Sequence, residues 1–413
     1  MATAHPIAPS SAPFSAQLGA QLGAHLSALP HELPGWAALA PLADSQRRTA
    51  FLRCKPLPPG AWTQDLESKI ALTRSVSALL GLPFAGDHGL ADLPEGSFYV
   101  VPNDTLHGLA LARQLGIHGP DDLLGGVVPH AFVATKVITH GLTHATAPAP
   151  TGWSHRFAHE AEGVVLPGFS AFSPGCALAA GERLLARGPV RLKASSGVGG
   201  RGQCVVADGA ELKRRLAAID PAVLADEGLV LELNLGAVRT LSVGQIRVGG
   251  LTASYHGVQH LTRDARGAEV YGGSSLRIVR GGFRELLAQP LDDAQRIAVT
   301  QALGYHDAAL RCFSGMFASR SNYDVAQGTD EAGQWLSGVL EQSWRIGGAS
   351  PAEIAALRVF QDRPEVTVVN ASSHEAYGAD AVAPAGAVVG YDGTDARHGR
   401  LLKYAVVDTY GCA

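Results

Sequence analysis

Residues 193–203 have the sequence Lys-Ala-Ser-Ser-Gly-Val-Gly-Gly-Arg-Gly-Gln, in which a lysine precedes four glycines within six positions. The loop lies between two apolar segments, 190–194 and 203–207, that are typical of strands. A glycine turn lets backbone amides approach phosphate oxygens, and a lysine beside it supplies a compact positive charge. Only six of the 33 basic residues are lysines, which favours a specific role for each one retained. The pattern therefore predicts a phosphate-binding loop between two strands.

Three better-known glycine patterns do not fit this loop. Gly197, Gly199 and Gly202 match GxGxxG, but the dinucleotide fingerprint needs a helix directly after it, and here a strand follows. The Walker pattern is excluded because Gln203 and Cys204 stand where lysine and serine or threonine belong. A kinase also folds a glycine loop between strands, but the chain has no HRD or DFG tripeptide. An ordinary hairpin without a ligand stays open as the alternative.

Acidic residues further along the chain support the nucleotide interpretation. Glu232 lies near the end of the apolar segment 229–235, where a carboxylate and nearby backbone could bind an adenine edge. Asp324 and Glu341 lie on two apolar segments joined by a turn, a spacing that can bring two carboxylates together. Carboxylate oxygens are the ligands that hold Mg²⁺ against nucleotide phosphates. Each acid alone is more typical of a solvated strand end, so it is their order that indicates a site.

This order of features resembles the ATP-grasp superfamily, the carboxylate–amine and carboxylate–thiol ligases and their biotin-carboxylase-like relatives, over about residues 130–350. Five pieces make up the resemblance: a helix with Lys136 that ends at Gly141, the lysine and glycine loop at 193–202, the strand 229–235, the acidic strand 322–325, and the closing motif Glu-Gln-Ser-Trp-Arg at 341–345. A distant bacterial branch is the expected placement within the superfamily.

The resemblance implies ATP and Mg²⁺ as cofactors and a role for each residue. Lys193 would bind the α- and β-phosphates, the loop would cover the β- and γ-phosphates, and Glu232 with the following backbone would hold adenine. The implied ATP-binding residues are Lys136, Lys193, Ser195, Ser196, Gly197, Gly199, Gly200, Gly202, Glu232, Leu233, Asn234 and Leu235. The implied metal ligands are Asp324, Glu341 and Ser343. Arg345 would face the transferring phosphate or the substrate carboxylate, and Arg320, four residues before Asp324, is the second catalytic candidate.

Three positions depart from the superfamily pattern. Phe132 stands where an earlier lysine is usual, and Arg239 stands where a ribose-binding acid is expected. Ser343 replaces the asparagine of the metal-binding Glu-x-Asn motif, and a hydroxyl is a weaker ligand than an amide oxygen. The departures affect the expected binding of phosphate, ribose and a second metal ion.

The apolar spacing predicts an N-terminal α/β domain, followed by an α+β domain with a mostly antiparallel sheet. The resemblance implies that this second part has the ATP-grasp fold, with two α+β lobes and antiparallel sheets. The predicted domains are a disordered tail at 1–34, the α/β domain at 35–130, the ATP-grasp domain at 131–375 and a C-terminal segment at 376–413. Predicted helices cover 65–80, 106–116, 131–140, 176–188, 210–219, 293–313 and 351–361. Predicted strands include 97–101, 190–194, 203–207, 229–235, a pair across 240–258 turned at Gly249-Gly250, 322–327, 334–343 and 365–370.

Other candidate groups are less specific. His140 and His144 flank the helix stop at Gly141, where a histidine more often interacts with the helix dipole than with metal. His256 and His260 could share one face of a strand, but two imidazoles without a third ligand favour a structural or substrate-lining role. Arg277 and Arg280 are possible anion contacts, although a single arginine is more often a surface residue. No GxSxG motif indicates a serine nucleophile.

Composition narrows the classes of function. A formal charge of −4 argues against a protein held on nucleic acid by a basic face. The chain has no run of about 18 apolar residues, so the sequence predicts no membrane span. Five scattered cysteines without a CxxC pair fit free thiols in a reducing compartment, and the N-terminus lacks a secretory pattern, so we expect a cytoplasmic protein.

These observations predict an ATP- and Mg²⁺-dependent ligase that phosphorylates a carboxylate to an acyl phosphate for attack by an amine or another nucleophile. Its partners would be these small molecules, with neither nucleic acid nor membrane. A biotin-carboxylase-type reaction on bicarbonate is a narrower variant. The alternative, favoured by the changes at Phe132, Arg239 and Ser343, is a non-catalytic protein that binds ATP or a partner at a degenerate site. The sequence identifies neither the acceptor nor the oligomeric state.

Overall fold

The structure is a computed structural model that describes residues 46–55, 63–195, 197, 202–395 and 399–411. The predicted tail at 1–34 and the loop residues Ser196, Gly199 and Gly200 lie outside these residues. Within the described part, no helix is long and apolar enough to cross a membrane.

Parallel strands form the N-terminal part of the described chain. Strands β1 (Arg48–Arg53), β2 (Phe84–Gly89) and β3 (Phe98–Pro102) pair in the order β2-β1-β3. Helix α2 (Thr63–Leu80) connects β1 to β2, and its apolar spacing correctly predicts it. The short strands β4 (Leu106–His107) and β5 (Gly126–Val128) have helix α3 (Leu109–Gln114) between them. Together with β13 (Phe317–Ala318) they form another three-stranded sheet.

Residues 131–140 are not the single helix that the sequence predicts. The structure has two short 3₁₀ turns, Ala131–Ala134 and Lys136–Thr139, separated by Thr135 in an extended conformation. The segment holds five β-branched residues, which lose side-chain freedom in a helix. The Thr135 hydroxyl also accepts a hydrogen bond from the Val137 amide at 3.3 Å, which caps the second turn. Because Thr135 is extended, Lys136 does not lie where a continuous helix would place it.

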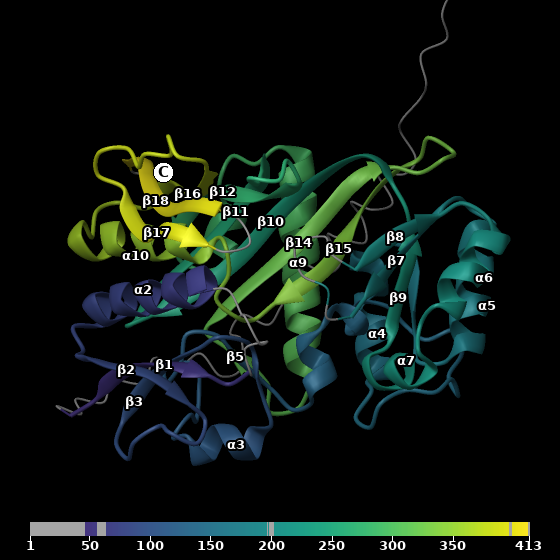
Figure 1. Cartoon of the computed structure of the whole chain (residues 1–413), viewed down its shortest axis with the longest axis horizontal. Coiled ribbons are helices and arrows are strands. Elements are labelled where there is room, and N and C mark those ends of the chain that lie inside the picture. The colour runs from purple at the N-terminus through teal and green to yellow at the C-terminus, as the bar shows by residue number, and fades with distance from the viewer. Residues whose placement is uncertain (1–45, 56–62, 196, 198–201, 396–398, 412–413) are drawn as a thin grey trace, which may run out of the picture. The chain divides into compact units, whose positions relative to one another are not determined.

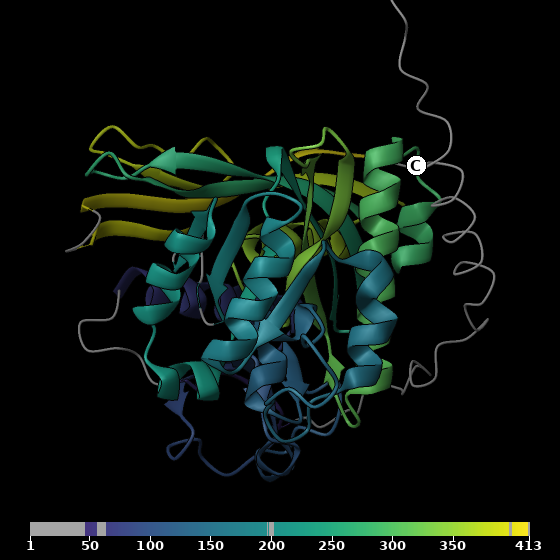
Figure 2. The same cartoon turned by 90° about the vertical axis from the view of Figure 1, so that its right-hand side faces the viewer.

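A four-stranded antiparallel sheet, here called the small sheet, contains the lysine and glycine loop. Its strands β6 (Gly168–Ala171), β7 (Val190–Ala194), β8 (Gln203–Val206) and β9 (Leu229–Leu233) lie in the order β6-β9-β7-β8. Helices α5 (Pro174–Leu185) and α6 (Gly209–Ala217) cover one face, in front of the sheet in Figure 2, and α7 (Pro221–Glu227) leads into β9. The predicted strands and helices of this lobe are confirmed.

An eight-stranded antiparallel sheet, here called the large sheet, contains both predicted metal acids (Figure 1). Its strand order is β15-β14-β10-β11-β12-β16-β18-β17. The strands are β10 (Gly236–Val248), β11 (Leu251–Arg263), β12 (Glu269–Arg280), β14 (Arg320–Thr329), β15 (Trp335–Ser343), β16 (Val368–Tyr377), β17 (Val388–Asp395) and β18 (Gly399–Gly411). Gly249 and Gly250 both have positive φ angles, 58° and 80°, as a tight hairpin turn requires. Two antiparallel sheets with helices confirm the α+β prediction for this part of the chain.

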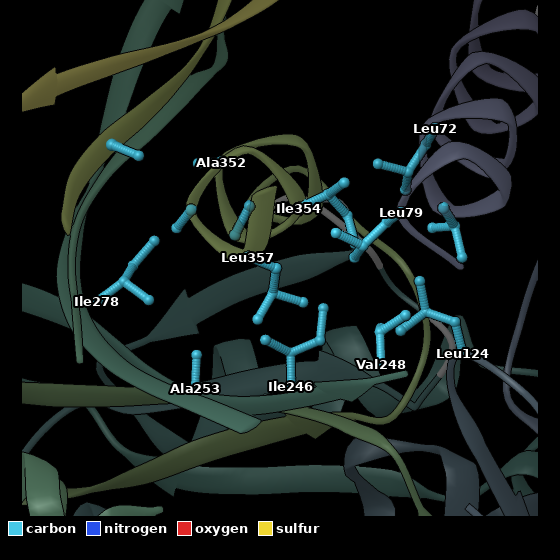
Figure 3. Close-up of a cluster of buried hydrophobic side chains, with 14 of the residues drawn as sticks. Leu72, Leu79, Leu124, Ile246, Val248, Ala253, Ile278, Ala352, Ile354 and Leu357 are labelled. Atoms are coloured by element: carbon cyan, nitrogen blue, oxygen red, sulfur yellow. The ribbon is translucent and has the colours of Figure 1, made fainter. Parts of the chain in front are cut away.

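Helices pack on both faces of the large sheet. On one face, α10 (Ser350–Asp362) and α2 form a core with apolar side chains of β10, β11, β12 and β16 (Figure 3). The opposite face is covered by α8 (Phe283–Leu287) and α9 (Asp293–Cys312), and α4 (His155–Ala161) packs on α9. Because neighbouring residues of a strand point to opposite faces, the two faces have separate sets of side chains.

Candidate active site

The lysine of the glycine loop forms a buried ion pair with the acid of the next strand. Lys193 on β7 lies opposite Val230 on β9, so Glu232 is its diagonal neighbour on the same face of the small sheet. The Lys193 ammonium pairs with Glu232 Oε1, and His140 Nε2 lies 3.3 Å from Glu232 Oε2. Burial tends to raise the pKa of Glu232, but Lys193 and His140 outweigh it and hold the pKa below its ordinary value. Glu232 is therefore ionised at neutral pH.

The contacts of residues 232–235 differ from those predicted for adenine binding. Both carboxylate oxygens of Glu232 have protein partners. The amide of Leu233 donates to the carbonyl of Pro167 at 2.9 Å, and that of Asn234 donates to Pro189 at 2.8 Å. Leu235 is buried beside Leu166. The adenine role predicted for the Glu232 carboxylate and these two amides is thus not supported, because their hydrogen bonds are already made within the protein.

Lys136 connects the glycine loop to the large sheet. Its ammonium donates to the carbonyl of Gly197 at 2.7 Å and forms an ion pair with Glu341 on β15. Gln342, the next residue on β15, donates to the carbonyls of Val133 and Thr135 at 3.2 and 2.7 Å. Gln342 thus holds the segment on which Lys136 lies, although Lys136 precedes Glu341 by 205 positions in the chain.

The described part of the glycine loop closes on itself. The amide of Ala194 donates to the carbonyl of Gly202 at 2.9 Å, and that of Gly197 donates to Ala194 at 3.2 Å. Gly202 has a φ of 71°, which a residue with a side chain rarely adopts. Ser195 is buried, whereas the carbonyl of Gly197 is bound to Lys136.

The two predicted metal acids are cross-strand neighbours. Asp324 on β14 lies directly opposite Glu341 on β15, and Ser242 on β10 lies opposite Asp324 on its other side. Asp324 Oδ1 accepts hydrogen bonds from Ser242, Gln259 and Asn322 at 3.2, 2.9 and 3.0 Å. Burial, followed by the negative charge of Glu341, raises the pKa of Asp324 above its ordinary value. The two carboxylates thus repel each other.

A divalent cation fits this donor set. Mg²⁺ prefers oxygen ligands and is commonly held by one or two carboxylates together with phosphates and water. A cation would relieve the repulsion between Asp324 and Glu341. No group of three or more histidine, cysteine, aspartate or glutamate side chains that could hold a metal ion occurs among the residues that the structure describes. Two carboxylates would leave the other coordination positions of Mg²⁺ to phosphates and water.

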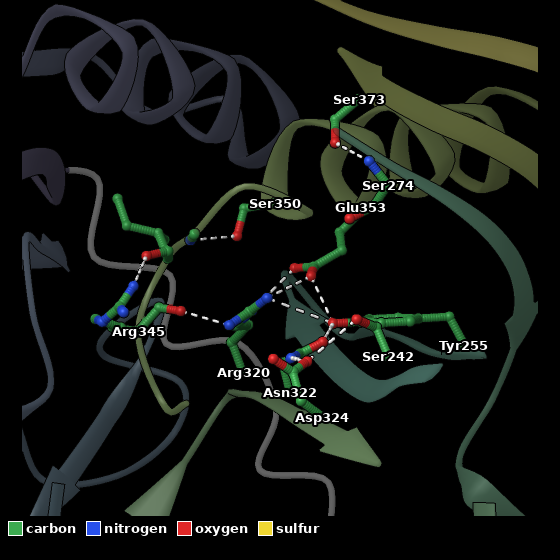
Figure 4. Close-up of polar contacts among 12 residues, drawn as sticks. Ser242, Tyr255, Ser274, Arg320, Asn322, Asp324, Arg345, Ser350, Glu353 and Ser373 are labelled. Atoms are coloured by element: carbon green, nitrogen blue, oxygen red, sulfur yellow. Dashed lines mark hydrogen bonds and ion pairs between the residues drawn. The ribbon is translucent and has the colours of Figure 1, made fainter. Parts of the chain in front are cut away.

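Arg320 lies in a buried network with Glu353 and Tyr255 (Figure 4). It makes a two-pronged contact with Glu353 on α10, with Nη2–Oε1 and Nε–Oε2 distances of 2.7 and 3.1 Å. It also donates to the carbonyl of Arg345 at 2.5 Å and to the Tyr255 hydroxyl at 3.4 Å. The side chain of Arg320 is 2% exposed. The structure thus corrects the prediction that Arg320 is a catalytic anion contact, because each of its nitrogens already has a protein partner.

Arg345 is more accessible and faces the N-terminal part of the chain. Its side chain is 27% exposed, and Nε lies 3.5 Å from Oδ1 of Asp104. Lys55 lies 3.0 Å from the other oxygen of Asp104. Burial would raise the pKa of Asp104, but the two cations outweigh it and keep the pKa below its usual range. One carboxylate thus lies between two cations from distant parts of the chain.

Arg345, Asp104 and Lys55 line a pocket of about 330 Å³, here called the lysine pocket. Six residues predicted from the sequence line it: Lys136, Ser195, Gly197, Glu341, Ser343 and Arg345. Cys54, Lys55, Asp104, Thr105 and His107 also line it, and sequence reasoning missed them. The rarity of lysine could have indicated Lys55, but nothing local to the sequence connects the turn at 102–104 with Arg345. Lys193, Glu232, Asp324 and Arg320 do not line this pocket.

The model of a family described as "Protein of unknown function (DUF3182)" matches residues 59–405. No curated protein matches the chain.

Several solved enzyme structures are similar to the chain. A phosphoribosylamine–glycine ligase from Thermotoga maritima is 13% identical, with a TM-score of 0.46 over 89% of this chain and 92% of that one. A biotin carboxylase from Campylobacter jejuni is 12% identical, with a TM-score of 0.45 over 87% of each chain. A D-alanine–D-alanine ligase from Bacillus anthracis is 14% identical, with a TM-score of 0.43 over 73% of this chain and 87% of that one.

The reaction of this chain has to be inferred from its own residues, because these likenesses are distant. Its two antiparallel sheets, with the lysine and glycine loop on the small sheet and the paired acids on the large one, give an ATP-grasp-like fold. That is the fold which the sequence resemblance predicts.

Proposed function

The chain belongs to the DUF3182 family, and we propose that it is an ATP- and Mg²⁺-dependent ligase that activates a carboxylate for attack by an amine or another nucleophile. The observation that supports this most is the lysine pocket. It joins the glycine loop, a metal-type acid and an arginine in one cavity, although these residues come from distant parts of the chain.

Each residue has a distinct task in the proposed reaction. Lys136 and Lys193 hold the phosphates of ATP, and the amides of the glycine loop cover them. Asp324 and Glu341 hold Mg²⁺, with the Ser343 hydroxyl beside them. Bound Mg²⁺ would neutralise the charge of the phosphates. Because little covalent chemistry falls to the protein in phosphoryl transfer, positioning and charge account for most of the catalysis.

Arg345 is proposed as the residue that orients the substrate carboxylate. An arginine binds a carboxylate through two parallel hydrogen bonds, and Arg345 lies in the same pocket as Glu341. An oxygen of the substrate carboxylate attacks the γ-phosphorus, the bond to ADP breaks, and an acyl phosphate forms. The nucleophile then attacks the acyl carbon and phosphate leaves. Arg320 acts only as a positioning residue, because it holds the carbonyl of Arg345.

Two internal ion pairs favour a second candidate, a protein that binds a nucleotide or partner without turning it over. Lys193 is paired with Glu232, and Lys136 with Glu341, so both lysines already have counter-charges. In this alternative the pairs persist and the site does not open to phosphates. The proposed ligase requires that Glu341 exchanges Lys136 for Mg²⁺ when the nucleotide binds.

Positional isotope exchange in ¹⁸O-labelled ATP tests the ligase without knowledge of the acceptor. A carboxylate that is phosphorylated reversibly scrambles the label between the bridging and non-bridging β-phosphate oxygens. We expect scrambling that depends on Mg²⁺ and on a member of a pool of small carboxylic acids, and that is lost in Glu341→Gln. Glu331→Gln, in an exposed turn, is the matched control. Tight ATP binding without scrambling for any acid would favour the binding protein.

A further inference from the structure

A second pocket, of about 290 Å³, lies on the other face of the large sheet. On β11, His256 pairs with Val243, whereas Asp324 pairs with Ser242. Because successive residues of β10 point to opposite faces, His256 and Asp324 lie on opposite sides of the sheet. The pocket, here called the arginine pocket, is thus separate from the lysine pocket.

Polar side chains from adjacent strands form a row in the arginine pocket. His256 on β11 lies opposite Arg277 on β12, which in turn lies opposite Asn370 on β16. Arg239 lines the pocket from β10, two residues before Leu241 on the same face. Side chains directly opposite each other on adjacent strands are close enough to bind one small group together.

Within the described part of the chain, the positive charges in the arginine pocket are not neutralised by ion pairs. Among the residues that the structure describes, no carboxylate forms an ion pair with Arg239 or Arg277. Asp408 also lines the pocket, but its carboxylate accepts a hydrogen bond from the Ser372 hydroxyl at 3.1 Å. Asp292, whose charge acts on His256, accepts the amide of Gln295 at 2.7 Å at the start of α9. Two guanidinium groups therefore face one carboxylate in the lining.

His256 provides an independent sign of a ligand. His256 is 8% exposed, and its ring nitrogen Nε2 is buried without a hydrogen-bond partner in the described structure. Buried polar atoms in native proteins nearly always have a partner. Burial, followed by the charge of Arg277, lowers the pKa of His256 to about 4, so the ring is neutral at neutral pH. A neutral imidazole can donate one ring N–H to a ligand oxygen.

We propose that the arginine pocket binds a small organic anion through a carboxylate or phosphate head group, held by Arg239 and Arg277 with His256 as a third donor. Guanidinium groups bind both kinds of anion through paired hydrogen bonds. Leu241 and Val258, which lie opposite each other on the same face, line the apolar part of the pocket. The ligand is small, because the volume lies at the lower end of the range of ligand pockets.

Calorimetric titration of the full chain with inorganic phosphate and with succinate tests the proposal and separates the two sources of anion. We expect saturable binding of at least one probe, and the tighter probe identifies the head group. Arg277→Gln should weaken it by about tenfold or more, as loss of a charge-assisted hydrogen bond does. Arg214→Gln, which removes an exposed arginine from α6 on the small-sheet lobe, should leave the affinity unchanged. Arg239→Gln serves as a second variant if Arg277→Gln does not fold.

A site-specific readout excludes binding elsewhere. The ¹⁵N-edited imidazole signal of His256, assigned from its absence in His256→Asn, should shift during the titration. The proposal is overturned if neither probe saturates at millimolar concentration, if the signal of His256 does not move, or if the Arg277 or Arg239 variant binds as tightly as Arg214→Gln. ATP affinity should be unaffected by Arg277→Gln, because the two pockets lie on opposite faces of the sheet.

Discussion

Lys193 and Glu232 form an ion pair in which the two side chains are only 4% and 2% exposed. Removal of one member of such a pair leaves an uncompensated charge in the interior, whereas replacement of both by apolar residues can be nearly neutral. Each member therefore needs the other for the small sheet to stay stable, and Lys193 also belongs to the proposed phosphate site.

We expect Lys193→Met to destabilise the chain by about 3–5 kcal/mol, the usual cost of breaking a buried pair. The double variant Lys193→Met with Glu232→Leu should recover most of that loss. Urea unfolding followed by circular dichroism measures both. ATP affinity should remain weak in the stable double variant, and an affinity equal to that of the wild type would remove Lys193 from the nucleotide site.

Glu341→Gln should lower kcat by about 10²–10³ while the fold and much of the ATP affinity persist, because the lost interaction acts on charge in the transition state. The glutamine keeps the volume of the side chain, so unfolding would not explain a loss. Steady-state release of ADP with the activating carboxylate gives kcat, and calorimetry gives the affinity. A rise in KM alone, with kcat unchanged, would contradict the proposed metal ligand.

Arg320 and Arg345 should respond differently to the same substitution. Arg320→Met breaks a pair whose side chains are 2% and 0% exposed and should cost about 3–5 kcal/mol of stability. Arg345→Met should leave the midpoint of unfolding nearly unchanged and raise the KM for the carboxylate. Arg358→Met, which removes an exposed pair with Asp362, is the control and should cost less than about 1 kcal/mol. A fully stable Arg320→Met would show that the buried network is dispensable.

Acid should destabilise the chain through His306. Burial lowers the pKa of His306 to about 4 from an ordinary value of 6.5, while its Nδ1 lies 2.7 Å from the Tyr323 hydroxyl. Between these two values the unfolded chain binds more protons than the folded one. The contribution of His306 is therefore complete above the higher value and is lost as the pH falls toward the lower one. The free energy of unfolding should depend less steeply on pH in His306→Gln than in the wild type.

The sequence predicts the parts of the site that depend on local pattern. The strands around the glycine loop, the hairpin at Gly249-Gly250 and the neighbouring strands of Asp324 and Glu341 all follow from apolar spacing and turn residues. The helix predicted at 131–140 is wrong because β-branched residues and the extended Thr135 divide it. Contacts over long distances in the chain, such as Lys136 with Glu341 and Arg345 with Asp104, leave no local sign.

The sequence also does not predict strand β12, for a different reason. Its middle contains Gly272, Gly273, Ser274 and Ser275, which do not show the alternation of a strand with one buried face. The structure pairs it with β11 and β16 on both sides, so hydrogen bonds from neighbours determine its conformation. Strand β12 places Arg277 beside His256. Because the sequence does not predict this strand, it does not predict the arginine pocket.

The segment with Lys136 has a second consequence, which follows from the position of β15 at the end of the strand order. Gln342 binds two carbonyls of that segment, and Val165 bridges Val339 further along the same strand. An uncovered terminal strand offers unpaired amides and carbonyls to other molecules, and such strands are sites of aggregation. A molecule in which residues 131–139 detach would lose Lys136 from the pocket and would also free the carbonyl of Leu340 on β15, which the Thr139 hydroxyl binds at 3.5 Å, for pairing with another molecule. Inactivation and self-association of this protein should therefore begin with the same local opening.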